Sequence, residues 1–407
     1  MEIVVQKYGG SSVATTEKIK KVAEKVIRKK EEGYHVVVIL SAMGKTTDHL
    51  ISLAKDISDN PDPREMDMLL TTGEQVSIAL LSMALNAKGY LAVSFTGSQL
   101  NIQTTAMHQK ARIKDIEISK LQKSLNEDKI IVVAGFQGVT KDNEYTTLGR
   151  GGSDTSAVAL AAKLGASCEI YTDVDGIYTM DPRKLKNAKK INKISYEEMM
   201  EIASLGAGVI HYRAVEMAQK YEIPIYIAST FSDKKGTIIM NGGENLMEET
   251  LITGMASSLE DIQVTLLNLT SCTGSLYRLF GELAQQEANV DMISQMLTED
   301  NKMNVSFTIP KTDLHIAEGI VDKWRKEDKS IQWEVSTDIA KISVVGIGMR
   351  SHSGVAAKVF ELMAENNIEI KMVTTSEIKI TWIVDVKDEL KVIELIGKEF
   401  GLKEVHA

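Results

Sequence analysis

The chain has 407 residues, and at roughly 150 residues per domain this length predicts two or three domains. The 47 lysine and arginine residues against 56 aspartate and glutamate residues give a net charge of -9, which disfavours a polyanion-binding surface. Two cysteines exclude a disulfide framework, and an aromatic content of 5% leaves few stacking platforms for single-stranded nucleic acid. No 18 apolar residues run together and the first residues lack the basic start of a signal peptide, so we expect a cytoplasmic protein without a membrane span.

The first half of the chain alternates β-branched runs with helical patterns. A short strand at 3–5 is followed by apolar residues at helical spacing over 19–27. The run 36–40 has no polar alternation, which is typical of a strand buried on both faces of a parallel sheet. The alternation continues with helices at 76–87 and 113–125 and strands at 91–95, 130–133 and 225–227. We therefore predict an α/β domain over 1–240, with a mainly parallel open sheet sandwiched by helices.

The second half has a different character and contains an internal repeat. A polar segment at 240–245 is suited to a hinge. Beyond it, Gly274, Phe280, Ala284 and Met292 recur 80 residues later as Gly354, Phe360, Ala364 and Met372. This repeat predicts two β-turn-α-β modules, at 250–335 and 336–407. A paired-sheet dimerisation domain that binds no ligand is the alternative interpretation.

Two glycine-containing segments could hold an anion. Lys7-Tyr8-Gly9-Gly10 follows the first predicted strand, at the sheet edge where open α/β folds bind ligands. Segment 149–154 combines three glycines with Arg150 and Asp154 just before a predicted helix. Segment 149–154 is not the dinucleotide fingerprint, because Asp154 takes the position of the third glycine. Gly44-Lys45-Thr46 does not complete a P-loop either, because Ile39 stands where that motif needs a glycine. A purely structural turn remains the alternative for both anion-binding segments.

Acidic residues mark three further positions. The segment 172–178 follows a predicted strand and could orient a magnesium nucleotide, although an Asp-rich turn would explain it equally well. Asp181-Pro182-Arg183 follows shortly afterwards. Glu74 stands in the first turn of a helix, where the helix dipole alone would favour an acid.

Taken together and in order, the motifs 7–12, 41–44, 72–74, 149–154, 172–178 and 181–183 resemble those of the aspartate kinases in the amino acid kinase family. Those enzymes carry paired ACT regulatory modules after the kinase domain, and 346–354 with 375–379 resembles the second of them. The resemblance implies ATP-dependent phosphorylation of the side-chain carboxylate of L-aspartate to 4-phospho-L-aspartate. This reaction is the first step toward lysine, threonine and methionine, and the modules imply feedback regulation.

The resemblance also implies roles for individual residues. Lys7 would hold the transferring phosphoryl group and Asp154 would orient Lys7; Glu74 would meet the α-ammonium of aspartate and Arg150 its α-carboxylate. The full set of aspartate contacts is Ser41, Thr47, Glu74, Arg150, Gly151, Gly152 and Ser153. The ATP contacts are Lys7, Tyr8, Gly9, Gly10, Thr172, Asp173, Tyr178, Asp181, Pro182 and Arg183. Mg²⁺ would arrive on the ATP phosphates, with no metal site in the protein.

The sequence differs from the family pattern at two places that bear on its ligands and partners. Gly208 stands where many family members have lysine, and Ser271-Cys272-Thr273-Gly274 replaces their Asp-Arg-Pro-Gly turn. We expect inhibition by lysine, threonine or both, with effector contacts at Asn289, Asp291, Gln295, Asn367 and Ile368. We also expect a homo-oligomer or an α2β2 assembly with a shorter regulatory subunit, and neither nucleic acid nor membrane as a partner.

Two other functions compete with this prediction. One is an amino acid kinase acting on glutamate, acetylglutamate or a nucleotide, which Glu74 disfavours for substrates that lack a free ammonium. The other is an amino-acid sensor that kept the fold and lost turnover. Lys7, Arg150 and Asp154 argue against the sensor, and Gly208 is the feature in its favour.

Overall fold

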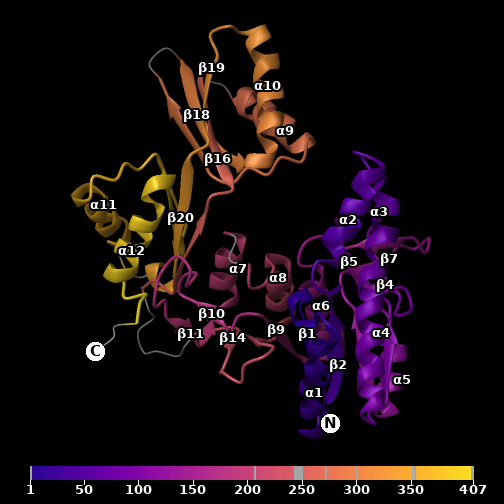
Figure 1. The fold of residues 1–407 in the computed structure, drawn as a ribbon. Helices are drawn as coiled ribbons and strands as arrows, with labels where there is room; N and C mark the ends of the chain where they lie inside the picture. The colour runs from indigo at the N-terminus through magenta and orange to yellow at the C-terminus, as the bar shows by residue number, and fades with distance from the viewer. Residues whose placement is uncertain are drawn as a thin grey trace. The chain divides into compact units, whose positions relative to one another are not determined.

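The computed structural model describes residues 2–205, 208–242, 251–270, 273–298, 301–350, 352 and 354–404. The chain divides into two compact units (Figure 1). One, called here the kinase unit, comprises Met1–Tyr178 and Lys190–Met247. The other, the regulatory unit, comprises Thr179–Lys189 and Glu248–Ala407, so it includes a short excursion from the first half of the chain.

The kinase unit is built on an eight-stranded mixed sheet. Every neighbouring pair of strands is parallel except β13 and β14, which are antiparallel. In spatial order the strands are β12 (Lys193–Ile194), β14 (Thr237–Ile239), β13 (Ile225–Ser229), β9 (Ser167–Thr172), β1 (Ile3–Tyr8), β2 (His35–Leu40), β6 (Ile130–Ala134) and β3 (Ala92–Phe95). The buried apolar runs at the centre of this sheet confirm the predicted α/β fold class.

Helices cover both faces of the sheet because successive strand residues point to opposite sides. Val4 and Tyr8 of β1 share one core with helices α1 (Thr16–Glu31) and α4 (Thr72–Ala87). Lys7 points to the opposite face, where it meets α6 (Gly152–Leu164). The unit also contains α2 (Thr46–Ile57), α3 (Pro63–Leu70), α5 (Ser119–Asn126), α7 (Tyr196–Ser204), α8 (Tyr212–Tyr221) and the short helix η1 (Gly10–Val13).

The stretch Pro63–Ala87, formed by α3 and α4, is long and apolar enough to cross a membrane by length and composition alone. Half of its most apolar window is buried inside the protein. Leu81 and Leu85 lie in the core between α1 and the sheet. This packing accounts for its apolar character as that of a core helix.

A second, four-stranded sheet in the kinase unit corrects one predicted element. Its strands are β5 (Ile113–Ile116), β4 (Ile102–Thr104), β7 (Gln137–Val139) and β8 (Tyr145–Thr147). The helix predicted over 113–125 is wrong in its first part, because Ile113 and Ile116 pair with β4 and the helix begins only at Ser119. A two-stranded ribbon of β10 (Ile177–Tyr178) and β11 (Lys190–Ile191) completes the unit.

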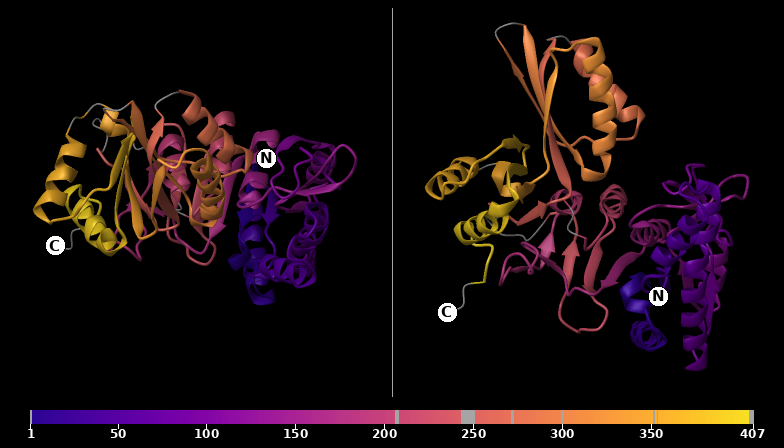
Figure 2. Two further views of the ribbon diagram at one scale, coloured as in Figure 1. Left: turned by 90° about the horizontal axis from the view of Figure 1, so that it is seen from above. Right: turned by 45° about the horizontal axis from the view of Figure 1, so that its top comes forward.

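The regulatory unit contains two four-stranded antiparallel sheets, each carrying helices (Figure 2). The first comprises β17 (Ile293–Leu297), β18 (Lys302–Pro310), β16 (Asp261–Thr270) and β19 (Gln332–Ser336), with α9 (Thr273–Gln285) and α10 (Leu314–Glu327). The second comprises β15 (Gly254–Ser258), β20 (Ile339–Val345), β22 (Lys379–Asp385) and β21 (Met372–Thr375), with α11 (Val355–Glu365) and α12 (Glu389–Glu399). Short helices are η2 (Lys311–Asp313), η3 (Ile347–Arg350) and η4 (Val386–Asp388). Because β15 pairs with β20, residues 261–336 form a continuous module inserted between two neighbouring strands of the other sheet.

Candidate active site

The loops that carry the predicted site residues leave the sheet at one edge. The parallel register pairs Tyr8 with both Leu40 and Tyr171, and it pairs Leu40 with Ala134. On the other side of β9, Tyr171 pairs with Ala228. Strands β1, β2, β6, β9 and β13 therefore end level with one another, and the loops that follow them open side by side at the edge where α/β sheets bind ligands.

An ion pair joins β1 to the first turn of α6. The Lys7 Nζ lies 2.7 Å from Asp154 Oδ1, and the two side chains are only 12% and 10% exposed. The other oxygen of Asp154 accepts a hydrogen bond of 3.3 Å from the backbone N–H of His211. A Cβ added to Gly9 would lie 3.5 Å from Lys7 Nζ, so the ammonium group sits directly beside the glycine loop. The structure thus places a fixed cation beside the glycine loop at the sheet edge, an arrangement suited to a phosphoryl group.

The loop after β1 packs tightly on the loop after β2. A Cβ on Gly10 would approach the carbonyl oxygen of Ala42 to 2.8 Å, and the Gly44 N–H donates to the Gly10 carbonyl at 3.0 Å. The Ser41 hydroxyl in turn donates to Ser153 Oγ at 3.0 Å, at the start of α6. Residues distant in sequence therefore form one continuous wall of the site.

Glu74 is a buried carboxylate with one oxygen unused. It is 2% exposed, and its Oε1 accepts the backbone N–H of Ala42 at 3.1 Å. Its Oε2 has no hydrogen-bond partner among the residues that the structure describes. Burial raises the pKa of Glu74 to about 7, although the Glu74 and Ala42 backbone N–H groups lower it. A cation supplied by a ligand would satisfy this oxygen and hold the carboxylate in its charged form.

Arg150 sits at the tip of a turn that only glycine can form. Gly149 and Gly151 on either side of it have φ angles of 76° and 65°, which side chains rarely adopt. A Cβ on Gly151 would in addition lie 2.1 Å from the His211 Cβ. Arg150 itself is exposed, and the described part of the chain gives it no hydrogen bond or ion pair. Its guanidinium remains available for a carboxylate.

The structure distributes the other predicted site residues unevenly. Thr47 lies in the first turn of α2, directly after the 41–45 loop. Thr172 ends β9 and Asp173 follows it at the same edge, where the Thr172 hydroxyl donates to Asp173 at 3.0 Å. Tyr8 contributes only its backbone there, because its side chain is fully buried and stacks on Tyr171 with ring centroids 5.0 Å apart. Asp181, Pro182 and Arg183 belong to the regulatory unit, where Arg183 pairs with Asp181 at 2.7 Å.

The comparisons with known proteins agree with this geometry. Residues 2–229 match the amino acid kinase family, and residues 342–400 match the ACT domain. The chain is 49% identical to "Aspartokinase 2" of Bacillus subtilis (strain 168) over 406 residues, which cover 99% of each protein. The crystal structure of E. coli aspartokinase III with aspartate and ADP is similar with a TM-score of 0.81 at 25% identity, covering 98% of this chain and 99% of that one. The structure of that enzyme with lysine and aspartate has a TM-score of 0.76 at 25% identity, over 98% and 100% of the two chains.

The chain belongs to the aspartokinases of the amino acid kinase family. It is therefore a phosphotransferase with an aspartate kinase domain and a C-terminal ACT region, which confirms the predicted family, fold class and enzyme class.

Sequence reasoning missed several residues of this aspartokinase that the structure brings into or against the site. Asp175 accepts the hydroxyl of Tyr178 at 2.8 Å and lies 3.6 Å from the ammonium groups of both Lys190 and Lys234. The partner lysines come from distant segments, so only the acidic stretch itself could have signalled this cluster. His211 is a second case: burial lowers the pKa of its ring, and its Nδ1 accepts the N–H of Arg213 at 3.3 Å as the cap of α8.

The predicted effector residues lie in the regulatory unit. Asn289, Gln295 and Asn367 are exposed, and Ile368 lines a cavity of about 540 Å³ between β17, β18, α11 and β21. Asp291 is engaged by Lys341, whose ammonium lies 2.8 Å from Asp291 and 2.9 Å from Asp261. Ser271 and Cys272 fall outside the described residues. Gly208 is exposed, and a Cβ there would meet nothing within 4 Å.

The Arg150 turn predicts a contrast between two glycines of α6. Alanine at Gly165, where φ is 60° and no atom lies within 4 Å, should cost about 1–2 kcal/mol of stability and leave turnover intact. Alanine at Gly151 meets the same strain and also strikes His211, so we expect kcat/KM for aspartate to fall about 100-fold through displacement of the turn. Steady-state kinetics and thermal unfolding of both variants check this. Equal activity of the two would contradict the assigned role of the turn.

The raised pKa of Glu74 predicts a pH-dependent stability of the ligand-free protein. Between pH 4.5 and 7 the folded state binds a proton that the unfolded state has released, so this group makes stability fall as pH rises through that window. Above pH 7 the burial of the charge costs roughly 3 kcal/mol, and Glu74→Gln should remove this cost. Relative to the parent, the variant should gain thermal stability from pH 5 to pH 8. A constant difference between the two unfolding curves over this range would show that Glu74 does not titrate as described.

Proposed function

We propose that this aspartokinase transfers the γ-phosphoryl group of ATP to the side-chain carboxylate of L-aspartate at the sheet edge described above. The observation that carries the proposal is the Lys7–Asp154 ion pair, which fixes an ammonium group beside the Gly9-Gly10 loop. The complex of E. coli aspartokinase III with aspartate and ADP supports the choice of both substrates.

The proposed phosphoryl transfer depends on the positioning of ATP and aspartate more than on proton transfer. An aspartate side chain has a pKa near ~4 and is already ionised at neutral pH, so the nucleophile requires no general base. Lys7 and the backbone N–H of Gly10 would neutralise charge on the transferring phosphoryl group, and Asp154 would keep Lys7 directed toward it. One such electrostatic contact is typically worth about 10²–10³-fold in kcat.

Two side chains of opposite charge would recognise the amino acid substrate. The unpartnered Oε2 of Glu74 would accept the α-ammonium group, and Arg150 would bind the α-carboxylate. The other proposed contacts are Ser41, Thr47, Gly151, Gly152 and Ser153. Because the ammonium must find Glu74 charged, aspartate binding would strengthen as pH rises through 7.

Thr172, Asp173 and Tyr178 would contact the nucleotide within the kinase unit. Asp181, Pro182 and Arg183 are assigned to ATP by the family resemblance alone. No group of three or more Asp, Glu, His or Cys side chains with metal-binding potential occurs among the described residues, whereas the exposed carboxylate of Asp173 could face a magnesium nucleotide. Mg²⁺ bound to ATP would supply positive charge that offsets the charge of the phosphates.

The regulatory unit would bind lysine, threonine or both. The crystal structure of E. coli aspartokinase III with lysine and aspartate supports the choice of lysine. Asn289, Gln295, Asn367 and Ile368 remain the proposed contacts, with Asp291 available once it exchanges Lys341 for an effector ammonium. We also propose a cytoplasmic location and a homo-oligomer, with the α2β2 assembly as the alternative.

Trapping of the acyl phosphate tests the proposed reaction. The protein incubated with ATP, Mg²⁺ and hydroxylamine should yield hydroxamate from aspartate but not from glutamate. Lys7→Ala should lower kcat by at least about 100-fold while calorimetry still detects aspartate binding, because Lys7 acts on the phosphoryl group. Product from glutamate would favour the rival kinase, no product would favour the sensor, and a fully active Lys7→Ala variant would overturn the role of Lys7.

Isothermal titration tests the proposed effectors. Lysine or threonine injected into the full chain should release or absorb heat, and the same amino acid should lower the rate of hydroxamate formation. Glycine and alanine serve as matched controls, because they carry the ammonium and carboxylate groups without the longer side chains. Absence of heat and of inhibition with both lysine and threonine would reject the proposal.

A further inference from the structure

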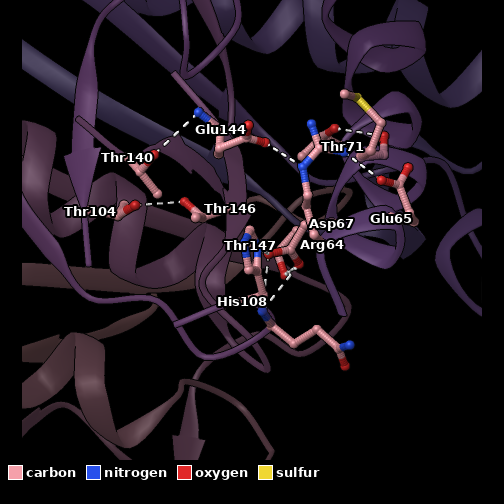
Figure 3. Close-up of polar contacts among 12 residues, drawn as sticks. Arg64, Glu65, Asp67, Thr71, Thr104, His108, Thr140, Glu144, Thr146 and Thr147 are labelled. Atoms are coloured by element: carbon pink, nitrogen blue, oxygen red, sulfur yellow. Dashed lines mark hydrogen bonds and ion pairs between the residues drawn. The ribbon is translucent and has the colours of Figure 1, made fainter. Parts of the chain in front are cut away.

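A second buried carboxylate lies outside the proposed chemistry. Asp67 of α3 is fully buried, yet three groups bind it (Figure 3). The Thr147 hydroxyl donates to its Oδ1 at 2.6 Å, and the Gln109 N–H donates to both oxygens at 3.1 Å. The Nδ1 of His108 lies 2.8 Å from its Oδ2. A buried charge with this many partners holds its neighbours in fixed positions.

The neighbours of Asp67 are the two segments that enclose the Arg150 turn. Thr147 ends β8, two residues before Gly149. Gln109 lies against Gly149 itself, since a Cβ there would approach the Gln109 carbonyl oxygen to 2.8 Å. The two segments are also joined directly, because the Ala111 N–H donates to the Thr147 carbonyl at 3.0 Å.

Arg213 of α8 braces the same two segments. Its Nη1 donates to the carbonyl of Leu148 at 2.5 Å and its Nη2 to the carbonyl of Ala111 at 3.0 Å. Asp67 thus receives hydrogen bonds from these segments, and Arg213 donates to their carbonyl groups. The backbone that leads into the turn is therefore hydrogen-bonded to both Asp67 and Arg213.

Asp67 is also mechanically connected to Glu74. Helix α3 continues through Thr71 directly into α4, so Asp67 stands only seven residues before Glu74 on the same helical stretch. The Thr71 carbonyl, between the two, accepts the side-chain amide of Gln137 at 3.1 Å. One end of this stretch therefore carries Glu74, and the other holds the turn that carries Arg150.

We propose that Asp67 is a positioning residue that sets the separation between Glu74 and Arg150, and thereby the length and orientation of the amino acid that the site accepts. This inference rests on the proposed function, in which Glu74 binds the ammonium and Arg150 the carboxylate. Asp67 touches neither substrate. It acts by tying α3 to the backbone on both sides of Gly149, so that the two charges move as one body.

The test is a split between the two Michaelis constants. Asp67→Asn keeps the size of the side chain but replaces one acceptor oxygen with a donor that faces the same donors. We expect KM for aspartate to rise about 10-fold or more, with KM for ATP unchanged within about two-fold, because a misplacement near 1 Å disturbs a bound geometry strongly. The preference for aspartate over glutamate in the hydroxamate assay should fall as well. A merely structural residue would lower the active fraction and leave both constants and the preference unchanged.

Arg64→Gln is the matched control. Arg64 lies on the same helix and pairs with Glu144 at 2.5 Å just before β8, but both side chains are substantially exposed (Figure 3). Its loss removes another tie between α3 and β8 without touching the Gly149 region, so both KM values should stay within about two-fold of the parent.

Thr147→Val tests the positioning role of Asp67 if Asp67→Asn fails to fold. Valine has nearly the shape of threonine and removes one hydrogen bond to Asp67, so it should raise KM for aspartate about three- to ten-fold in the same selective manner. An unchanged aspartate KM in the folded variants, with an active parent, would overturn the role of Asp67 alone. A parent that forms no aspartyl hydroxamate would instead overturn the proposed function on which this inference rests.

Discussion

The ion pair between Lys7 and Asp154 is the interaction on which the kinase unit depends. It ties the end of the central strand to the first turn of α6, and a charge so little exposed is tolerable only because the opposite charge stands beside it. Other elements are hydrogen-bonded to the same turn of α6. Asp154 also accepts the N–H of His211, and the neighbouring residue Ser153 accepts the hydroxyl of Ser41. The ion pair and these two hydrogen bonds thus hold α6, the start of α8 and the loop after β2 against the end of β1.

The charge balance of the site distinguishes the proposed phosphoryl-binding group from the proposed amino-acid contacts. Lys7 and Asp154 neutralise each other as an ion pair. Glu74 and Arg150 are not paired with each other, and Glu74 Oε2 finds no partner among the described residues. A zwitterion with one further carboxylate complements these two free charges, whereas a nucleotide or an acylated amine would leave Glu74 buried and unmatched. The specificity of the site would therefore come from the cost of an unsatisfied group as much as from attraction.

Much of the fold could be predicted from the sequence because the relevant signals are local. The unbroken apolar run at 36–40 predicts a strand buried on both faces, and the structure places it inside the sheet between β1 and β6. The Arg150 turn could be found as well, since its positive φ angles at Gly149 and Gly151 favour glycine, which is a local signal. The helix predicted over 113–125 is wrong at 113–116, because Ile113 and Ile116 pair with β4. Pairing partners distant in sequence leave no local trace.

The residues that the sequence did not reveal share one physical property. Asp67 is 80 residues from its partner Thr147, and His211 is 57 residues from its partner Asp154, so Asp67 and His211 acquire their contacts only when the chain is folded. Before folding, an acid in α3 is indistinguishable from the solvated charges on any amphipathic helix, and Glu74 looks like an ordinary dipole-stabilising residue of a first turn. Burial is what separates them, and burial depends on all the packing around the residue. The conformation of a glycine turn or a buried strand can therefore be predicted from its own segment. The role of a buried charged residue can be predicted only when its partners in the fold are known.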